Sequence, residues 1–355
     1  VSWARDVYKR QPNAASRFFC PIQEKEIGWE AKDVFNPAAV VKDDRVYLLY
    51  RAEDHEGKYA GTSRVGMAVS EDGLHFQTMP EPVLYPEKDE FSIYEWEGGC
   101  EDPRIVETKD GKYFLYYTSF NGKVALLSCA ESTDLVHWKK HGPIFKDTLN
   151  GKYKDLWSKS GAVVCRQEGD HFYPVKLKET YWMYWGESDI YAATSDDLIH
   201  WTPVEFLADG ADPSHSFSQH DSRCKDNDEV ARVLLPIIRP RVGNYDEFLC
   251  EPGPQAILTD AGIVLIYNGK GNNPERLGGH DTMYQGGQLL IDPENPTCLI
   301  ARTTRPFISP SESFELEGQV MPTCFLEGLV SFHGRYYMYY GTADSKVAVA
   351  SAPQK

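Results

Sequence analysis

The chain has 355 residues, of which 25% are charged and 41% hydrophobic, a balance typical of a folded globular protein. Its formal net charge of −16 argues against a nucleic-acid partner, because phosphate contacts need clustered lysines and arginines. No apolar run approaches the roughly 18 residues of a membrane helix, so we expect no membrane partner. Aromatic residues are abundant at 13%, and we expect most of them to pack between the repeated β units described below.

The cysteines do not form a recognisable metal motif. All eight occur without a CxxC pair or a His-Cys cluster, so we expect no zinc, no other metal and no cofactor. Cys129, Cys165 and Cys250 lie in or beside predicted strands and are expected to be buried thiols. The even number of cysteines leaves disulfides open.

Residues 1–17 do not join the pattern of the rest of the chain. They contain neither an initiator methionine nor the apolar stretch of a secretory signal. We interpret them as a segment outside the main domain, left by cloning or by sequence assembly. A bacterial cytoplasmic or periplasmic location therefore stays open.

A two-strand unit recurs five times along the chain, at intervals of roughly 70 to 80 residues. In each copy an aromatic-rich strand ends in a small or polar residue, and a second short strand follows. The first strands are 45–51, 112–118, 180–186, 262–268 and 335–341, and their partners are 65–69, 124–129, 190–194, 287–291 and 346–350. Such a period predicts an array of supersecondary units.

Three partner strands run into the same turn, in which a serine and an aspartate precede a histidine. These histidines are His75, His137 and His200. Their repetition in three units favours a structural role over a catalytic one.

Five β units that close on themselves form a five-bladed β-propeller, whose closure leaves only short, protected edges. We therefore predict an all-β fold in which residues 18–355 form one such domain, with any active site in the central funnel. The expected blades are about 36–90, 99–145, 158–205, 250–300 and 322–352. Residues at about 209–247 fit no blade and are interpreted as an insertion between blades three and four.

The first candidate catalytic residue is Asp102, at the entrance of the second blade. Gly98 and Gly99 precede it and permit close backbone approach, and Pro103 is expected to keep it extended. A carboxylate held stiffly at a strand entrance suits a general acid or base. The alternative is that Asp102 merely pairs with Arg104.

Three further acidic residues lie where strands begin or end. Glu187 follows the third repeated strand beside two large aromatics, which would raise its pKa if it were buried. Glu251 enters blade four as Asp102 enters blade two, with a proline after each. Asp344 closes blade five, where it suits a hydrogen bond to a sugar hydroxyl or, alternatively, a turn. Several inward carboxylates in an aromatic-lined funnel indicate glycoside chemistry.

Several motifs together resemble glycoside hydrolase family 130, from about residue 20 to the C-terminus apart from the insertion. They are Asn36-Pro-Ala38, Tyr50-Arg-Ala-Glu-Asp54, Arg64-Val-Gly-Met-Ala68, Glu101-Asp-Pro-Arg104 and Tyr340-Gly-Thr-Ala-Asp344, together with turns of the Ser-Asp-Leu-x-x-Trp type. That family acts on β-mannosides and contains phosphorylases and hydrolases, both inverting. The resemblance implies that Asp102 is the general acid, acting in the phosphorylases through a hydroxyl of the mannose. It also implies that four residues hold the sugar in the −1 subsite: Asn36, Arg51, Arg64 and Asp344.

The resemblance also indicates which of the two branches, phosphorylases or hydrolases, this chain is expected to join. Phosphorylases of the family typically have a His-Arg pair after the third repeated strand, with the arginine binding phosphate, and a Gly-Ala-Gly-type stretch at the start of blade four. This chain has Gly186-Glu187 and Glu251-Pro-Gly253 instead. It thus lacks a cation at that position and adds two carboxylates that would repel phosphate. We expect an inverting hydrolase that cleaves β-1,2-linked mannosides.

The expected mechanism is a single displacement. Asp102 protonates the glycosidic oxygen, directly or through the substrate, while Glu187 and Glu251 hold and deprotonate water. The sequence does not decide which glutamate is the base. Inversion predicts that acid and base carboxyls lie roughly 6.5–9.5 Å apart.

Three alternatives stay open. A phosphorylase would bind phosphate through other cations, such as Arg239 or Arg241. A carbohydrate-binding propeller would lack catalysis, and an arabinan- or fructan-type glycosidase would release pentose or fructose. In each case the partner is a small carbohydrate, and the oligomeric state is unknown.

Overall fold

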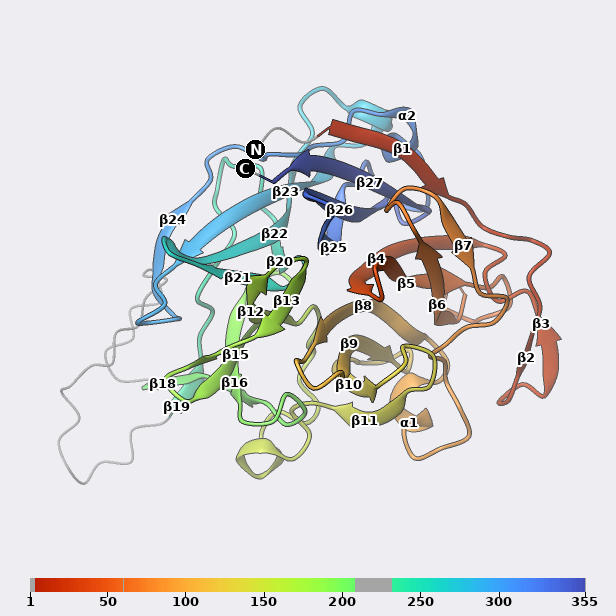
Figure 1. Cartoon of the computed structure of the whole chain (residues 1–355), viewed down its shortest axis with the longest axis horizontal. Helices are drawn as coiled ribbons and strands as arrows, with labels where there is room; N and C mark the ends of the chain where they lie inside the picture. Colours follow the sequence, from red (N-terminus) through yellow and green to blue (C-terminus); the bar gives the residue numbers. More distant parts are fainter. Residues whose placement is uncertain (1–3, 60, 208–231, 355) are drawn as a thin grey trace.

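The computed structural model describes residues 4–59, 61–207 and 232–354, and strands make up nearly all of its regular structure (Figure 1). The helices among these residues are short turns: α1 (Ser92–Glu95), α2 (Ser313–Leu316), η1 (Thr148–Gly151) and η2 (Leu277–Gly279). None of the described helices has the length and apolarity to cross a membrane. The prediction of an all-β chain is confirmed.

Each of the five repeated strands pairs antiparallel with its predicted partner. The pairs are β5 (Arg45–Glu53) with β6 (Ser63–Ser70), β9 (Tyr113–Phe120) with β10 (Ala125–Ser132), β15 (Thr180–Trp185) with β16 (Tyr191–Ser195), β22 (Gly262–Asn272) with β23 (Thr282–Ile291), and β26 (Arg335–Thr342) with β27 (Lys346–Pro353). The repeat read from the sequence is therefore confirmed at the level of strand pairs.

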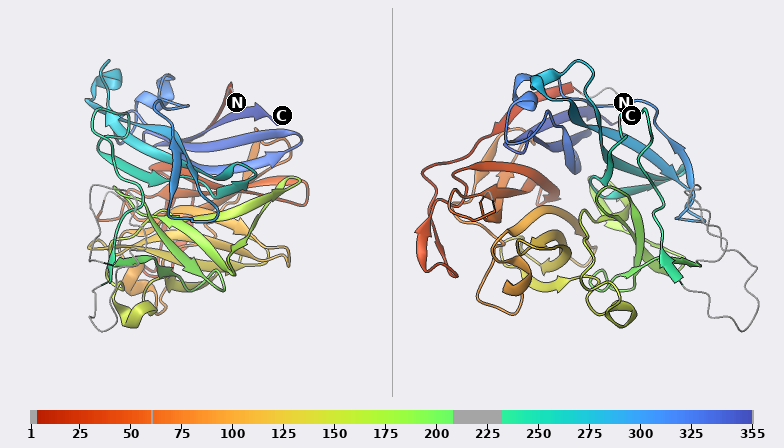
Figure 2. Two further views of the ribbon diagram at one scale, coloured as in Figure 1. Left: turned by 90° about the vertical axis from the view of Figure 1, so that its left-hand side faces the viewer. Right: turned by 180° about the vertical axis from the view of Figure 1, so that it is seen from behind.

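Each pair is joined by a further strand that precedes it in the chain, and together they form one of five strand groups. This further strand lies on the side of the group that faces the centre of the molecule. These inner strands are β4 (Asp33–Lys42), β8 (Gly99–Glu107), β12 (Ala162–Glu168), β20 (Leu249–Pro252) with β21 (Ala256–Thr259), and β25 (Phe325–Phe332). The five groups follow one another in chain order around a common centre, and Figure 2 shows the same groups from the side and from behind (Figures 1 and 2). The inner strands therefore bring distant parts of the sequence together.

Short outer strands add to four of the groups: β7 (Phe76–Thr78), β11 (Lys139–Pro143), β17 (Thr202–Pro203) and β24 (Leu299–Arg302). In the fifth group this place is taken by β1 (Ala4–Arg10), which pairs antiparallel with β27. The expectation that residues 1–17 lie outside the repeated units therefore differs from the structure. Backbone pairing with the edge of β27 brings this segment into the sheet, although its sequence does not carry the repeated pattern.

The remaining strands lie at the margins of the groups. They are β2 (Phe18–Cys20), β3 (Lys25–Ile27), β13 (His171–Pro174), β14 (Lys176–Leu177), β18 (Glu205–Leu207) and β19 (Arg232–Leu234). Of the expected insertion at 209–247, residues 209–231 lie outside the described residues. Its later part begins with β19, which pairs with β18, and continues to Ile238, which bridges to Ile190 of the third group.

The hydrophobic core consists of clusters that lie between neighbouring groups. One cluster packs Tyr116 of the second group edge-to-face against Trp201 of the third, with ring centroids 6.0 Å apart. Others join the remaining neighbours in the same way. The expectation that the aromatic residues pack between β units is confirmed, and Cys129, Cys165 and Cys250 are buried free thiols as predicted.

The repeated turn is built by local hydrogen bonds. Nδ1 of His75 lies 2.7 Å from Oδ2 of Asp72, and Oδ1 of the same aspartate accepts the backbone N–H of His75. His137 and His200 have the same arrangement with the aspartate three residues earlier. Their structural role is confirmed, because each histidine closes its own turn.

Close backbone approach joins the first two groups. Ser63 of β6 pairs in parallel with Gly99 of β8, and Gly99 has φ of +113°. A Cβ at Gly99 would lie 2.1 Å from the backbone oxygen of Ser63. Only glycine therefore fits at this junction.

We predict that Gly99→Ala lowers the free energy of unfolding by more than about 3 kcal/mol, since backbone strain and a backbone clash add. Gly111→Ala is the matched control: Gly111 has φ of +81°, but a Cβ added there would meet no atom within 4 Å. It should lose only about 1–2 kcal/mol. Chemical denaturation of both variants measures the difference, and equal losses would contradict the clash.

Candidate active site

A pocket of about 240 Å³ opens at the centre of the ring and receives residues from all five strand groups. Six of the seven predicted site residues line it: Asn36, Arg51, Asp102, Glu187, Glu251 and Asp344. It is also lined by residues that were not predicted, namely Lys159, Lys270, Tyr284, Val320, Met321, Thr323 and Phe325. The sequence thus identified most of the polar lining, although the motifs are far apart along the chain.

Arg64 is the predicted site residue that does not line this pocket. Its side chain is buried, and its Nη1 donates to Oδ2 of Asp54 at 2.7 Å and to the backbone oxygen of Thr62 at 3.1 Å. Asp54 also accepts the backbone N–H of Thr62, so the ion pair organises the loop between β5 and β6. The structure therefore places Arg64 outside this pocket, in the ion pair that supports the loop.

Asp102 reaches the pocket because β8 contains a β-bulge. Its pairing with β9 shifts register between Glu101 and Arg104, and Asp102 has φ of +46°. The expectation that Pro103 holds Asp102 extended is wrong, because the bulge places this residue in the left-handed region. β-Bulges re-aim side chains in this way beside active sites.

The carboxylate of Asp102 is surrounded by donors. Oδ1 accepts from Nδ2 of Asn36 at 2.9 Å and from Nη1 of Arg51 at 3.1 Å, while Oδ2 lies 3.6 Å from Nζ of Lys159. Burial favours the neutral carboxyl, but Arg51 and Lys159 outweigh burial and hold the pKa of Asp102 below its usual range. Asp102 is therefore ionised in the site as it stands.

Arg51 is shared among several carboxylates. Besides Asp102, it donates to Glu53 at 2.7 Å and to Glu101 at 3.1 Å, and its Nε donates to Ser63 at 2.9 Å. Burial raises the pKa of Glu101, against the influence of Arg51. Arg51 thus holds the carboxylates of Glu53, Glu101 and Asp102 together at one side of the pocket.

Arg104 does not pair with the Asp102 carboxylate, contrary to the alternative considered from the sequence. It donates to the backbone oxygens of Asp102 at 3.1 Å and Pro252 at 3.0 Å, and its Nη1 lies 2.9 Å from Oε1 of Glu327. Arg104 therefore ties the second, fourth and fifth groups together.

Glu251 is buried on β20 and accepts a hydrogen bond from the hydroxyl of Ser160. Burial raises the pKa of Glu251 to about 7, and the nearby charge of Glu187 adds to the rise. Glu187 is less buried and accepts from the indole N–H of Trp157 at 2.7 Å. The two glutamates are therefore close enough to interact electrostatically.

One short segment before β12 contacts all three predicted catalytic carboxylates. Trp157 donates to Glu187, Lys159 lies beside Asp102, and Ser160 donates to Glu251. Burial lowers the pKa of Lys159, but Asp102 and Glu187 raise it by more, so the ammonium group is charged. This segment was not predicted from the sequence, because it lies before the repeated strands and carries no motif.

The pocket contains cations other than the arginines considered from the sequence as phosphate ligands. Lys159 and Lys270 line the pocket, whereas the arginines considered from the sequence have other surroundings. Arg241 forms a two-pronged pair with Asp246, at 2.8 and 3.1 Å. Arg51, Lys159 and Lys270 are therefore the cations that line the pocket.

Asp344 lies at the pocket wall with φ of +50°. Burial raises the pKa of Asp344 to about 7, and Arg51 opposes this rise while Asp102 adds to it. Its side chain is still partly open to the pocket. The carboxyl group of Asp344 is therefore a hydrogen-bond acceptor that is largely surrounded by protein but that a ligand in the pocket can reach.

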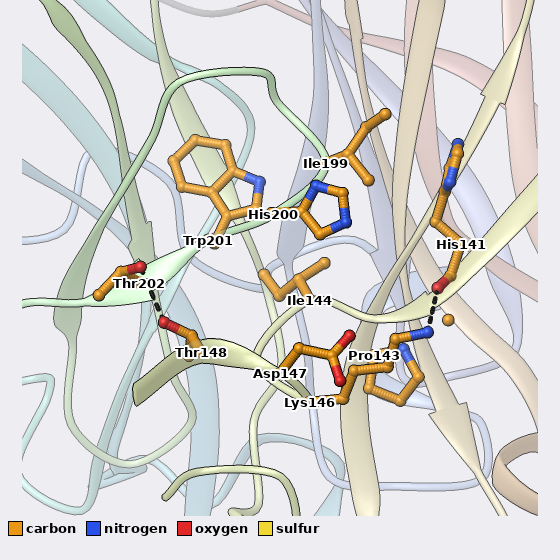
Figure 3. Close-up of a pocket in the computed structure, with 11 residues that line it drawn as sticks. His141, Pro143, Ile144, Lys146, Asp147, Thr148, Ile199, His200, Trp201 and Thr202 are labelled. Carbon is orange, nitrogen blue, oxygen red and sulfur yellow. Dashed lines mark hydrogen bonds between the residues drawn. The ribbon is translucent and has the colours of Figure 1, made fainter. Parts of the chain in front are cut away.

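A second pocket lies between the second and third groups, where Thr148 and Thr202 share a 2.8 Å hydrogen bond and Lys146 donates to the backbone oxygen of His141 (Figure 3). Trp201 in its wall is fully buried, so its ring offers no open face. The pocket contains none of the predicted catalytic residues. Among the described residues, no cluster of His, Cys, Asp and Glu could hold a metal ion.

Three known proteins are similar to this chain along most of its length. A glycosyl hydrolase from Bacteroides ovatus is 41% identical, and the match covers 100% of this chain and 95% of that structure with a TM-score of 0.88. A structure described with family 130 hydrolases that target β-1,2 mannosidic linkages in Candida mannan is 38% identical, covering 100% and 96% of the two chains with a TM-score of 0.88. A 1,2-β-oligomannan phosphorylase from Thermoanaerobacter sp. (strain X514) is 29% identical over 94% of each chain.

A family model described as β-1,4-mannooligosaccharide phosphorylase matches residues 9–355. This match spans all five strand groups and every residue that lines the central pocket. The chain therefore belongs to glycoside hydrolase family 130, whose members act on mannosides as phosphorylases or hydrolases.

Proposed function

We propose that this protein is an inverting hydrolase of β-1,2-linked mannosides, built as a five-bladed β-propeller with its active site in the central funnel. The observation that carries the proposal is the presence of Glu187 and Glu251 in the same pocket as Asp102. The five strand groups around one centre support the propeller (Figure 1). The structures with 38–41% identity, described as hydrolases, support the reaction.

In the proposed reaction, Asn36, Arg51 and Asp344 bind the mannose whose linkage is cleaved. Glu251 accepts a proton from a water molecule, whose oxygen attacks the anomeric carbon while the glycosidic bond breaks. Asp102 supplies the proton that the leaving oxygen takes up, directly or through a substrate hydroxyl. A pKa of about 7 suits a base near neutral pH, so we assign this role to Glu251.

The role of Asp102 as an acid requires that its pKa rise when substrate enters. Burial already acts in that direction, and a bound sugar removes more water from the carboxylate. Donors that turn from Asp102 toward the sugar would add to the rise. The ionised state of the ligand-free site is thus compatible with protonation in the complex.

A phosphorylase is the second candidate, and Lys159 and Lys270 favour it as possible phosphate ligands. The 29% identical oligomannan phosphorylase also favours it. Against it, Lys159 is already engaged by carboxylates, and each anion about 4 Å from phosphate opposes binding by about 4 kcal/mol at an effective dielectric of 20. We therefore place hydrolysis first.

Product analysis with β-1,2-mannobiose, with and without inorganic phosphate, tests the proposal. We expect free mannose at equal rates in both reactions, because water is the nucleophile. NMR of the first product should show α-mannose, as inversion requires. Mannose 1-phosphate formed only with phosphate would establish the phosphorylase instead, and no turnover would leave a carbohydrate-binding role.

The hydrogen bond from Ser160 to Glu251 allows the role of Glu251 as base to be tested through the pH dependence of kcat/KM. Its hydrogen bond lowers the pKa of Glu251, so Ser160→Ala should raise that pKa. A base works only when ionised, so the acidic limb of kcat/KM should move to higher pH. Ser158→Ala is the control, because Ser158 is a buried neighbour that accepts from the backbone N–H of Leu127. A shift of the alkaline limb alone would make Glu251 the acid.

We predict that replacing the carboxyl group of Asp344 raises the stability of the protein but lowers its activity. Its pKa of about 7 exceeds the ordinary value of 3.8, so its contribution to stability falls as the pH rises from about 4 to about 7 and is lowest above that range. Asp344→Asn should raise stability at pH 8 by on the order of 1 kcal/mol, with a smaller gain at pH 5, where the native carboxyl is already protonated. The same variant should lose at least about tenfold in kcat/KM.

Thermal unfolding at both pH values measures the stability effect of Asp344→Asn. The control is Asp260→Asn, since Asp260 is exposed in a turn. An equal gain for Asp344→Asn at pH 5 and pH 8 would show that its charge is not responsible.

A further inference from the structure

Three aromatic rings form a row that begins at the central pocket. Trp157 is tied to the pocket by its indole N–H, which donates to Glu187 at 2.7 Å. The ring of Phe120 meets Trp157 edge-to-face, with centroids 6.3 Å apart and planes at 65°. Tyr59 continues the row beyond Phe120, at 5.9 Å and 60°. The row therefore leads outward from a predicted catalytic carboxylate.

The three rings come from different strand groups and are held in place by backbone. Phe120 ends β9, Tyr59 lies between β5 and β6, and Trp157 precedes β12. A Cβ at Gly122 would lie 2.1 Å from the ring of Tyr59, so the ring rests directly against this glycine. The row is thus a fixed surface that needs little ordering when a ligand binds.

The two ends of the row are open to solvent. Trp157 is 47% exposed and Tyr59 is 37% exposed, whereas the aromatic residues between the strand groups are buried. Nζ of Lys58 lies over one face of the Tyr59 ring, 5.3 Å from its centroid, and adds a hydrogen-bond donor at the outer end. Partly exposed aromatic rings with a polar donor beside them suit a ligand with both apolar faces and hydroxyl groups.

We propose that Trp157, Phe120 and Tyr59 form a binding platform for the additional sugar residues of longer β-mannosides. This inference rests on the proposed function, because it concerns substrate that extends from the same pocket. The pocket volume of about 240 Å³ is below the roughly 300–1,000 Å³ of sites for larger ligands, so further sugar residues must lie outside it. The aromatic row is continuous with the pocket through Trp157 and Glu187.

The roles within the platform differ. Trp157 and Tyr59 present faces to the sugars, while Phe120 holds the two rings apart and fixes their tilt. Trp157 is also a positioning residue for Glu187, because the indole N–H orients that carboxylate. Substitution of Trp157 therefore affects two properties, and Tyr59 is needed to separate them.

The experiment compares kcat/KM for β-1,2-mannobiose, mannotriose and mannotetraose among variants. Trp157→Ala and Tyr59→Ala should each lower the ratio of mannotetraose to mannobiose by roughly 5- to 10-fold, the size of one lost stacking contact. Trp157→Phe keeps a ring but loses the donor to Glu187, so it should lower kcat on all substrates and largely keep the ratio. Phe19→Ala is the control, since Phe19 is 55% exposed on the peripheral strand β2.

Binding provides a second readout that does not depend on turnover. In a Glu251→Gln background, calorimetry should show that Tyr59→Ala weakens mannotetraose binding by a similar factor and affects mannobiose less. If the parent protein turns over all three mannosides and no variant changes the ratio, the platform is wrong while the proposed function stands. If the parent neither binds nor cleaves a β-1,2-mannoside, both are overturned.

Discussion

The arrangement of the site depends on one electrostatic constraint: buried carboxylates gather at the centre around a few cations. Arg51 is shared by Asp102, Glu101 and Glu53, and Arg104 lies beside Glu327. Because these cations cannot neutralise every acid equally, neighbouring carboxyls acquire different pKa values. Asp102 stays ionised, whereas burial raises the pKa of both Glu251 and Asp344 to about 7. In the proposed reaction this order must invert when substrate binds, because Asp102, the acid, has the lower pKa in the ligand-free site.

The backbone places these charges through irregularities in the inner strands. Asn36 and Asp102 each precede a proline, each has positive φ, and each lies at a register shift of its strand. The two side chains then meet in a 2.9 Å hydrogen bond. A third register shift occurs at Glu327 of β25. Regular strands would alternate these side chains between the two faces of a sheet, so the bulges direct polar groups to the centre.

Structural features that are local or that repeat along the chain can be predicted from the sequence. The repeated aromatic strands identify the five repeated strand pairs, and carboxylates at strand ends identify Asp102, Glu187 and Glu251 as candidates for one central site. It does not predict Lys159 and Ser160, because their roles arise only when the third group packs beside the second and fourth. Arg64 has the right motif, yet its position outside the pocket follows from a pair with Asp54. The strand β1 was also missed, because pairing with β27 uses backbone groups that any sequence offers.

A cation in the pocket does not by itself make a phosphate site. Nζ of Lys159 lies 3.6 Å from Asp102 and 4.0 Å from Glu101, so its charge already balances fixed anions. Lys270 lies 5.7 Å from the ring centroid of Tyr284, a contact that leaves its ammonium group available to a ligand. Phosphate would gain from Lys270 but would face Glu187 and Glu251 in the same small volume. In the proposed hydrolase the nucleophile is a water molecule, which carries no charge; Glu251 would accept its proton, and Glu187 would help to orient it. The local balance of charge, more than the presence of a lysine, therefore supports the proposal that water is the nucleophile.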